Sequence, residues 1–347
     1  MVLRRSKQRA GEPALPVIFR WDLDKTYLKS EFDSLRELVR IPFEKPEDKV
    51  AVPGVVPLIR NLREVAAQRG RAVRIYFMSA SPPQIAKAIK EKLALDGIEY
   101  DGIVFKNQLQ HLVRGKFRNL REQVGYKLTE LLKSRLTVPS GSREVLFGDD
   151  WESDPIIYSL YADLVAGRIV SDDLDEILTA IGVDPQLIVE AQTLAAEVRR
   201  EPAVTRIYIN LERRTPPTNF RAFGPRLVPA FNYFQTGACL FEEGHLTLGA
   251  VTQVAEELIN GSGYTPDRLA NSLADITRRG HLQQTSAIAV REYLRARGLL
   301  PRRAPHGGRT SVWERLTRWL RAKPAPAAAG DAAINYETLV TEWRAVR

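Results

Sequence analysis

Short apolar runs alternate with longer amphipathic stretches through the first 260 residues, and this alternation constrains the fold more than any other feature. The short runs, each bounded by polar or turn-forming residues, predict buried strands at Val17–Trp21, Ala72–Met78, Gly102–Phe105, Val145–Phe147 and Ile207–Ile209. The longer stretches predict helices at Gly54–Gln68, Gln84–Leu95, Tyr126–Leu136 and Pro155–Val165. Strands alternating with helices predict a parallel sheet covered on both faces, which binds ligands beyond the carboxyl ends of its strands.

Length and local composition divide the chain into a main domain with extensions. The 347 residues are enough for about two domains and a sizeable core. Within the main domain, 171–203 predicts a helical insertion, because Asp184-Pro185 marks a helix start before an apolar-periodic run. The expected units are a basic N-terminal arm at 1–12, the main α/β domain at 13–260, a helical extension at 261–300, and a linker, basic helix and tail at 301–347.

The net charge of +9 comes from the two ends of the chain. Residues 1–10 carry +4 and residues 301–323 carry +6, while the tail from 324 carries −1. The net charge of residues 11–300 is therefore zero. A neutral main domain makes nucleic acid an unlikely partner in spite of the basic isoelectric point.

Cysteine, histidine and hydropathy exclude several classes of protein. A single cysteine, Cys239, rules out an internal disulfide and a cysteine-based zinc site, and four scattered histidines argue against a histidine-rich zinc site. No apolar stretch approaches the ~20 residues that a membrane-spanning helix needs, and Met1–Ala10 is followed by no hydrophobic signal core. A cytoplasmic location is therefore expected.

Acidic residues follow two of the predicted strands. Asp22 and Asp24 can face one pocket where the first strand ends, and their mutual repulsion would then need a cation or a shared proton. A strand-ending turn explains the same D-x-D-x-T pattern equally well. Asp149 and Asp150 follow a later strand in the same way, and Asp154 before Pro155 is either a helix N-cap or a member of the acidic group.

A serine and a lysine accompany these acids. Ser81, followed by Pro82 and Gln84, fits a helix capping box, which leaves Ser79 at the strand tip to donate a hydrogen bond to a phosphoryl oxygen or to stabilise a turn. Lys127 is expected in the first turn of its helix, where a cation opposes the helix dipole; a functional role or simple solvation would account for it. Mg²⁺ would neutralise five carboxylates gathered at one sheet edge.

Taken in order, these motifs resemble those of the haloacid dehalogenase (HAD) superfamily of phosphatases: Asp22-Leu23-Asp24-Lys25-Thr26, Ser79, Lys127, and Gly148-Asp149 with Asp154. Three stretches further resemble the actin-patch-type phosphatidate phosphatase catalytic domain, a relative of the lipins: Phe77–Gln84, Gly125–Lys127 and Gly148–Tyr158. The resemblance extends over about residues 15–260, apart from 171–203. It implies a three-layer α/β/α HAD-like fold with little or no cap domain.

The resemblance also implies a mechanism. Asp22 would be the nucleophile that forms an aspartyl-phosphate, and Asp24 would protonate the leaving alcohol and then activate water. Ser79 and Lys127 would hold the phosphoryl oxygens. Lys25 stands where these phosphatases commonly have a small or acidic residue. Because Asp24 is present, an active enzyme is favoured over the non-catalytic lipid-sensing relatives.

The cofactor implied by the resemblance is Mg²⁺. Its expected ligands are Asp22, the backbone carbonyl of Asp24, Asp149 and Asp154, with Asp150 in reserve.

Chain spacing bears on the substrate. Only 52 residues separate Thr26 from Ser79, and the gap from Phe105 to Lys127 is also too short for a cap domain. An uncovered site suits a large or surface-bound substrate such as a lipid headgroup. The predicted function is a Mg²⁺-dependent phosphomonoesterase acting on phosphatidate or a related phospholipid. The alternatives are a soluble phosphate ester as substrate, a non-catalytic phospholipid- or phosphate-binding adaptor, and a nucleic-acid end phosphatase.

A basic amphipathic segment at 311–323 offers a means of reaching a membrane. Its apolar arc faces away from the arginines and consists of Val312, Trp313, Leu316, Trp319 and Leu320. Tryptophan opposite arginine suits a helix lying in an anionic membrane interface, and packing on the protein or a partner is the alternative.

Overall fold

The computed structural model describes residues 15–29, 50–79, 85–105, 120–151, 153–301 and 334–345. The arm at 1–12, the capping sequence at Ser81 and the basic segment at 311–323 lie outside these ranges. So do 30–49 and 106–119, the spans into which a cap would be inserted, and the expectation of little or no cap stays a prediction.

The described residues contain one six-stranded sheet in which every pairing is parallel. Its strands are β1 (Val17–Asp22), β2 (Val73–Ser79), β3 (Gly102–Phe105), β4 (Arg143–Asp149), β5 (Val204–Asn210) and β6 (Leu227–Ala230), in the order β3-β2-β1-β4-β5-β6. All five predicted strands are present. The sixth, β6, was missed because it has four residues and includes Pro229, which cannot donate to a ladder and is tolerated at a sheet edge.

The helices of the first half are α2 (Val55–Gln68), α3 (Ala86–Leu95), α4 (Leu120–Leu136) and α5 (Asp154–Val165). Those that follow are α6 (Ser171–Ile181), α7 (Pro185–Glu197), α8 (Tyr233–Glu242), α9 (Leu248–Ser262), α10 (Pro266–Arg278), α11 (Gln284–Ala296) and α13 (Tyr336–Ala345), with a 3₁₀ helix at Pro217–Phe223. The predicted start of α4 at Tyr126 is wrong, because the helix begins at Leu120. Among the described residues, no helix combines the length and apolar composition that crossing a bilayer requires.

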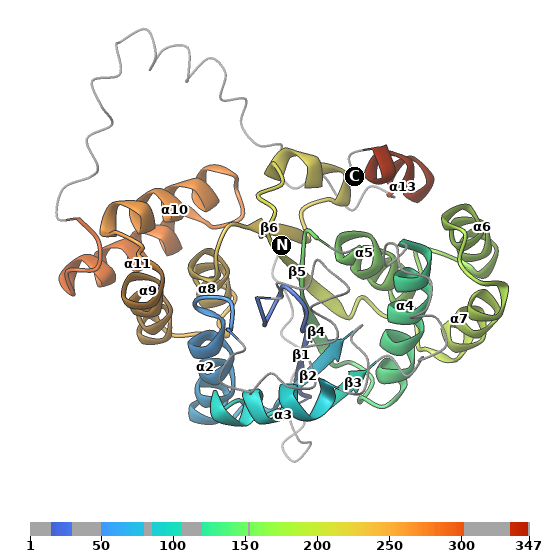
Figure 1. Ribbon diagram of the computed structural model, residues 1–347, viewed down its shortest axis with the longest axis horizontal. Coiled ribbons are helices and arrows are strands. Elements are labelled where there is room, and N and C mark those ends of the chain that lie inside the picture. The colour runs from blue at the N-terminus through green and yellow to red at the C-terminus, as the bar shows by residue number, and fades with distance from the viewer. Residues whose placement is uncertain are drawn as a thin grey trace, which may run out of the picture.

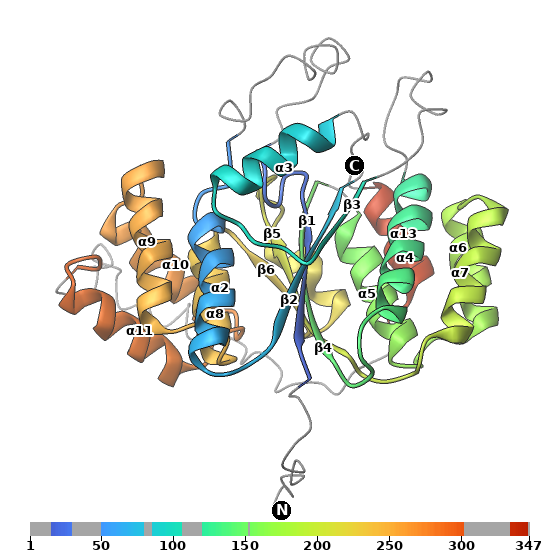
Figure 2. The same ribbon diagram turned by 90° about the horizontal axis from the view of Figure 1, so that it is seen from below.

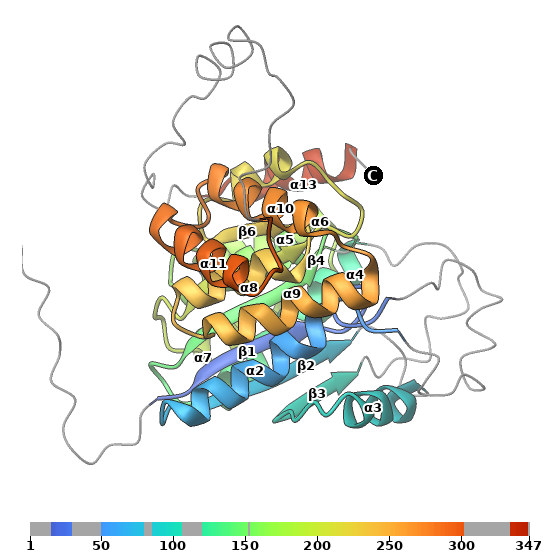
Figure 3. The ribbon, with the colours of Figure 1, turned by 90° about the vertical axis from the view of Figure 1, so that its left-hand side faces the viewer.

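The helices cover both faces of the sheet (Figure 1). Figure 2 shows α2 and α8–α11 on one side of the strands and α4–α7 with α13 on the other. On the first side α9 packs against both α2 and α8, and Figure 3 shows it lying along them. The predicted three-layer α/β/α architecture is confirmed.

Alternate side chains of the central strands enter two separate cores. On β4, Val145 and Phe147 pack with the α2–α8 side, while Leu146 between them packs with the α4–α5 side. Phe147 also stacks on Trp21 of β1, with ring centroids 3.7 Å apart and planes 1° from parallel. Because both faces are buried, the central strands are largely apolar, and a shift of register would be costly.

The last described helix returns to the main domain. Tyr336, Leu339 and Val340 of α13 are buried in the core formed with α5 and α6. The chain that leads up to residue 301 packs on one side of the sheet, and α13, which follows residue 333, packs on the other (Figure 1).

Candidate active site

The strand order brings the first two acidic motifs together. Because β1 lies between β2 and β4, its carboxyl end is flanked by the carboxyl ends of both neighbours. Asp22 is in register with Met78, so Ser79 lies one residue further along β2, and Asp149 ends β4. Asp22, Ser79 and Asp149 are all fully buried. The sheet therefore places these three predicted site residues at one edge.

Asp22, Asp149 and Asp154 form a compact acidic group. A carboxylate oxygen from each lies within 4.8 Å of the others, and all three residues are buried. Asp154 is the first residue of α5, and its Oδ2 accepts a hydrogen bond from the backbone N–H of Asp149 at 3.3 Å. The N-cap position belongs to Ser153, so the interpretation of Asp154 as the N-cap is wrong. The structure assigns Asp154 to the acidic group.

Gly148 makes this approach of Asp154 possible. A Cβ at Gly148 would lie 2.4 Å from Oδ2 of Asp154 and 2.6 Å from its Cβ, closer than real atoms come. The glycine before Asp149 is therefore required by packing between the end of β4 and the start of α5.

Lys127 reaches the acidic group from α4. Its Nζ donates to Oδ1 of Asp22 at 2.8 Å and to Oδ1 of Asp154 at 2.6 Å, and all three side chains are fully buried. Since α4 begins at Leu120, Lys127 lies about two turns inside the helix and not in its first turn, so the argument from the helix dipole is wrong. A buried lysine must instead be paired, and the two aspartates supply that pairing.

Asp24 lies beside Ser79 in the turn that follows β1. Its Oδ2 accepts a hydrogen bond from Ser79 Oγ at 3.0 Å, and its side chain is outside the group of three carboxylates. The turn is held by a bond from Lys25 N to Leu28 O at 2.8 Å, and the Tyr233 hydroxyl donates to the carbonyl of Thr26 at 2.5 Å.

Asp150 is directed to a neighbouring loop. Its Oδ1 accepts from the backbone N–H of Arg213 at 2.9 Å and its Oδ2 from that of Thr215 at 3.0 Å. Asp150 is not among the three carboxylates that lie within metal-binding distance of one another. The structure therefore brings Asp154, and not Asp150, to Asp22.

Two tyrosines support the site and were not singled out from the sequence. Burial, reinforced by nearby Asp154, raises the pKa of Tyr158 well above its usual value, and its hydroxyl donates to Phe147 O at 3.3 Å. Burial, reinforced by Asp149 and Asp22, likewise raises the pKa of Tyr233. Both phenols therefore stay protonated beside the acids. No local motif marks Tyr233, which lies over 200 residues from the turn that it supports.

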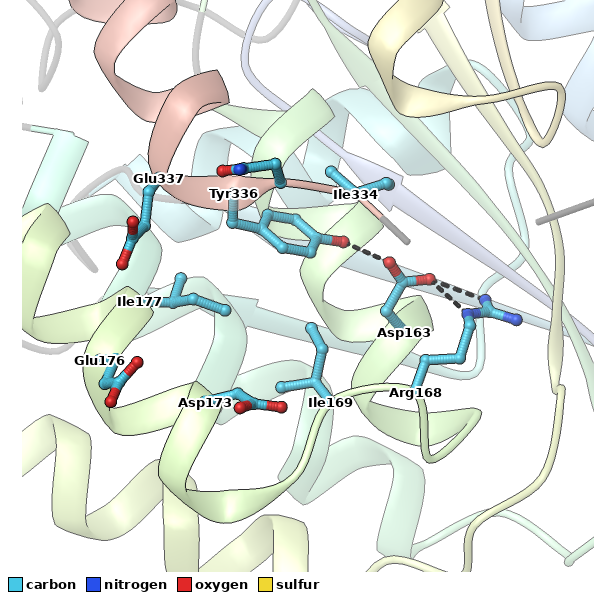
Figure 4. Close-up of a pocket in the computed structure, with 10 residues that line it drawn as sticks. Asp163, Arg168, Ile169, Asp173, Glu176, Ile177, Ile334, Tyr336 and Glu337 are labelled. Atoms are coloured by element: carbon cyan, nitrogen blue, oxygen red, sulfur yellow. Dashed lines mark hydrogen bonds and ion pairs between the residues drawn. The ribbon is translucent and has the colours of Figure 1, made fainter. Parts of the chain in front are cut away.

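A pocket of about 260 Å³ lies at the other end of α5, away from the acidic group. Tyr336 donates to Asp163 Oδ2 at 2.6 Å there, and Arg168 lies 2.7 Å from Asp163 Oδ1 (Figure 4). Arg226 pairs with the same carboxylate at 2.5 Å. These contacts fasten α13 to α5 and the segment that follows it.

Comparison with known proteins supports the resemblance drawn from the motifs. Residues 21–171 match the family described as "Phosphatidate phosphatase APP1, catalytic domain". The match includes Asp22, Asp24, Ser79, Lys127 and the acids after β4, and it is narrower than the expected range of 15–260. The family is one of phosphatase hydrolases, and residues 21–171 are similar to its catalytic domain.

The other comparisons add little. No curated protein matches the chain. A chain of a solved structure described as "Structure of Pnkp1/Rnl/Hen1 complex" is 15% identical with a TM-score of 0.27, over 40% of this chain and 40% of that one. The chain thus spans well under half of that relative, and so weak a likeness carries no functional information.

Proposed function

We propose that this protein is a Mg²⁺-dependent phosphomonoesterase that works through an aspartyl-phosphate on Asp22, with phosphatidate or a related phospholipid as substrate. The observation that carries the proposal is the buried group of Asp22, Asp149 and Asp154 beside Lys127. This group lies within the residues matched by the phosphatidate phosphatase family. The substrate class comes from that family's description, and a soluble phosphate ester is the alternative.

The acidic group fits a magnesium ion. Its donors are carboxylate oxygens, which hard divalent cations prefer, and one lysine leaves three buried carboxylates with an excess of negative charge. Asp22, Asp149 and Asp154 would hold the ion, together with the backbone carbonyl of Asp24. When bound, Mg²⁺ would offset the charge of the phosphoryl oxygens and so allow an anionic nucleophile to approach them.

In the first step an oxygen of Asp22 forms a bond to phosphorus while the bond from phosphorus to the alcohol oxygen breaks. Asp24 gives its proton to the departing alcohol oxygen. The hydrogen bond from Lys127 to Oδ1 of Asp22 orients the nucleophile. Lys127 and Ser79 are also the donors that would stabilise the phosphoryl oxygens as charge moves onto them.

In the second step Asp24, now a carboxylate, takes a proton from water. The water oxygen forms a bond to phosphorus as the bond from phosphorus to Asp22 breaks, which releases inorganic phosphate and restores both aspartates. Ser79, 3.0 Å from Oδ2 of Asp24, would hold the carboxylate toward the water.

The test is phosphate release from phosphatidate, lysophosphatidate, sugar phosphates and oligonucleotide ends, with and without Mg²⁺. The wild type is expected to hydrolyse phosphatidate only with Mg²⁺, and Asp22→Asn is expected to lose that activity. Acid-quenched enzyme should carry covalent phosphate in the wild type and none in Asp22→Asn.

Asp172→Asn is the control, since this exposed aspartate on α6 takes no part in the site. Full activity in Asp22→Asn would eliminate the mechanism. If the protein hydrolyses none of these esters but still binds phosphatidate, the non-catalytic adaptor function is favoured instead.

A further inference from the structure

The edge of the site carries positive charge, opposite in sign to the acids within. Lys25 Nζ lies 3.4 Å from the centroid of the Trp151 ring, and Arg213 Cζ lies 4.9 Å from the same centroid. We call these three residues the cationic rim. Trp151 joins the rim to the site, because its backbone N–H donates to Oδ1 of Asp149 at 2.5 Å. Lys25 directly follows Asp24 in the chain.

The backbone at the rim adopts an unfavourable conformation. Lys25 has a φ of 61°, in the left-handed region where glycine is far easier to accommodate. Among the described residues, the one other non-glycine residue with positive φ is Arg214, next to Arg213. Strained residues persist at functional sites where the side chain is needed. Both strained positions at this edge carry a cation, and the fold alone would be served better by glycine.

A buried carboxylate fixes the loop that carries Arg213. Asp150 is 2% exposed and accepts the backbone N–H groups of both Arg213 and Thr215. Asp150 immediately precedes Trp151, so one short segment presents the ring and also anchors the loop. Asp150 is therefore a positioning residue, and the rim has a defined geometry relative to Asp149.

The rim cations lie apart from the groups that would hold the scissile phosphate, since Lys127 and Ser79 contact Asp22 and Asp24 inside the site. A cation held on a ring face keeps its positive charge, which attracts anionic oxygens. We propose that the cationic rim binds a second anionic oxygen group beside the scissile phosphomonoester. This inference rests on the proposed function. The second group belongs either to the same molecule or to a neighbouring molecule in an anionic lipid surface.

Kinetics on four substrates separate these two sources. Phosphatidate is presented in neutral phosphatidylcholine vesicles, with and without added phosphatidylglycerol, and glycerol monophosphate is compared with glycerol bisphosphate. We expect Lys25→Gln to raise KM about tenfold, with kcat nearly unchanged, wherever a second anion is present. Lys25→Arg should keep the low KM. If Lys25→Gln raises KM only on vesicles that contain phosphatidylglycerol, the second anionic group belongs to a neighbouring lipid. If it raises KM only for glycerol bisphosphate, the second group belongs to the substrate molecule itself.

Two further variants separate binding from structural effects. Lys25→Gly relieves the strained φ and should raise KM like Lys25→Gln while its melting temperature stays level or increases. Arg297→Gln is the matched control, because its guanidinium lies 3.5 Å from the Tyr293 ring on α11, among the helices that cover the sheet and not at its carboxyl edge. It should change neither KM nor kcat. A KM in Lys25→Gln equal to that of the wild type on all four substrates would overturn the rim proposal.

A measurement without turnover keeps the two proposals distinguishable. Glycerol bisphosphate is titrated calorimetrically into Asp22→Asn, with and without Lys25→Gln. Binding that weakens about tenfold in the double variant supports the rim even if no ester is hydrolysed, in which case only the proposed function fails. If the two proteins bind glycerol bisphosphate equally, the wild type is active and Lys25→Gln leaves KM unchanged, then the rim proposal fails and the proposed phosphatase function stands.

Discussion

Lys127 and Asp22 form a fully buried ion pair, with Nζ 2.8 Å from Oδ1. The same ammonium lies 2.6 Å from Asp154, so one cation holds together the end of β1 and the start of α5. Ion pairs in such surroundings contribute little net stability while intact, but removing one partner leaves an uncompensated charge. Lys127 thus has a structural role in addition to the catalytic one proposed for it.

Replacement of Lys127 by methionine should therefore affect stability and activity together. Without Mg²⁺ we expect Lys127→Met to lose about 3–5 kcal/mol of unfolding free energy, because Asp22 and Asp154 remain buried without their cation. Added Mg²⁺ should restore part of that loss and raise the melting temperature more than in the wild type. Phosphate release should fall at least about a hundredfold.

Lys133→Met is the matched control, since Lys133 lies on the same helix with its side chain 46% exposed. It should change the unfolding free energy by no more than about 0.5 kcal/mol. An equal Mg²⁺-induced shift of melting temperature in Lys127→Met and wild type would contradict the placement of the metal beside this lysine.

Replacement of Gly148 by alanine should displace Asp154. The added Cβ would lie 2.4 Å from Oδ2 of that carboxylate, so we expect weaker Mg²⁺ activation and a loss of stability of about 1–3 kcal/mol. Titration of activity against Mg²⁺ concentration measures the first effect. Gly237→Ala on α8 is the control, because its Cβ would meet nothing closer than 3.9 Å, and a helical glycine replaced by alanine should gain stability. Unchanged Mg²⁺ activation in Gly148→Ala would refute the close packing.

Folding stability should decrease as the pH falls from about 6.5 toward 4. Burial, together with the neighbouring Arg71, Arg69 and Arg143, lowers the pKa of His245 to about 4. Burial likewise lowers the pKa of His281 to about 4. The unfolded chain takes up these protons first, so stability that is complete above pH 6.5 is lost on acidification. Each histidine should contribute a loss of up to about 2 kcal/mol at pH 5.

Urea unfolding at pH 7.5 and pH 5 checks this expectation. His245→Gln and His281→Gln should each show a smaller difference between the two pH values than the wild type does. Identical differences in all three proteins would mean that these imidazoles do not titrate as described.

We propose that the basic segment at 311–323 contacts anionic membranes; packing on the protein or a partner is the alternative. We expect the Trp313→Ser, Trp319→Ser double variant to co-sediment less with phosphatidylglycerol vesicles than the wild type, because it loses the large apolar side chains of the segment. This variant keeps α13, whose Tyr336 and Leu339 are packed into the core. Thr317→Ser is the control, and equal binding by all three proteins would exclude the segment as an anchor.

Periodicity within the sequence predicted most of the sheet, because strands buried on both faces are continuous apolar runs. Val145–Phe147 was recognised for this reason, and the structure extends it to Arg143–Asp149. The edge strand at Leu227–Ala230 was missed, since its proline and short length resemble a loop. The start of α4 was also missed, because few of the residues just before Tyr126 are apolar.

The sequence by itself determined the three-layer architecture, the acids that follow β1 and β4, and the similarity of residues 21–171 to the phosphatidate phosphatase family. These properties are encoded in short stretches of chain. Tertiary structure decided which acids meet, because the parallel register aligns Asp22 with the end of β4 and the packing of α5 on Gly148 brings in Asp154. It also directed Asp150 to the loop of Arg213 and placed Lys25 over Trp151. Contacts of this kind depend on strand order and helix packing, which no local pattern contains.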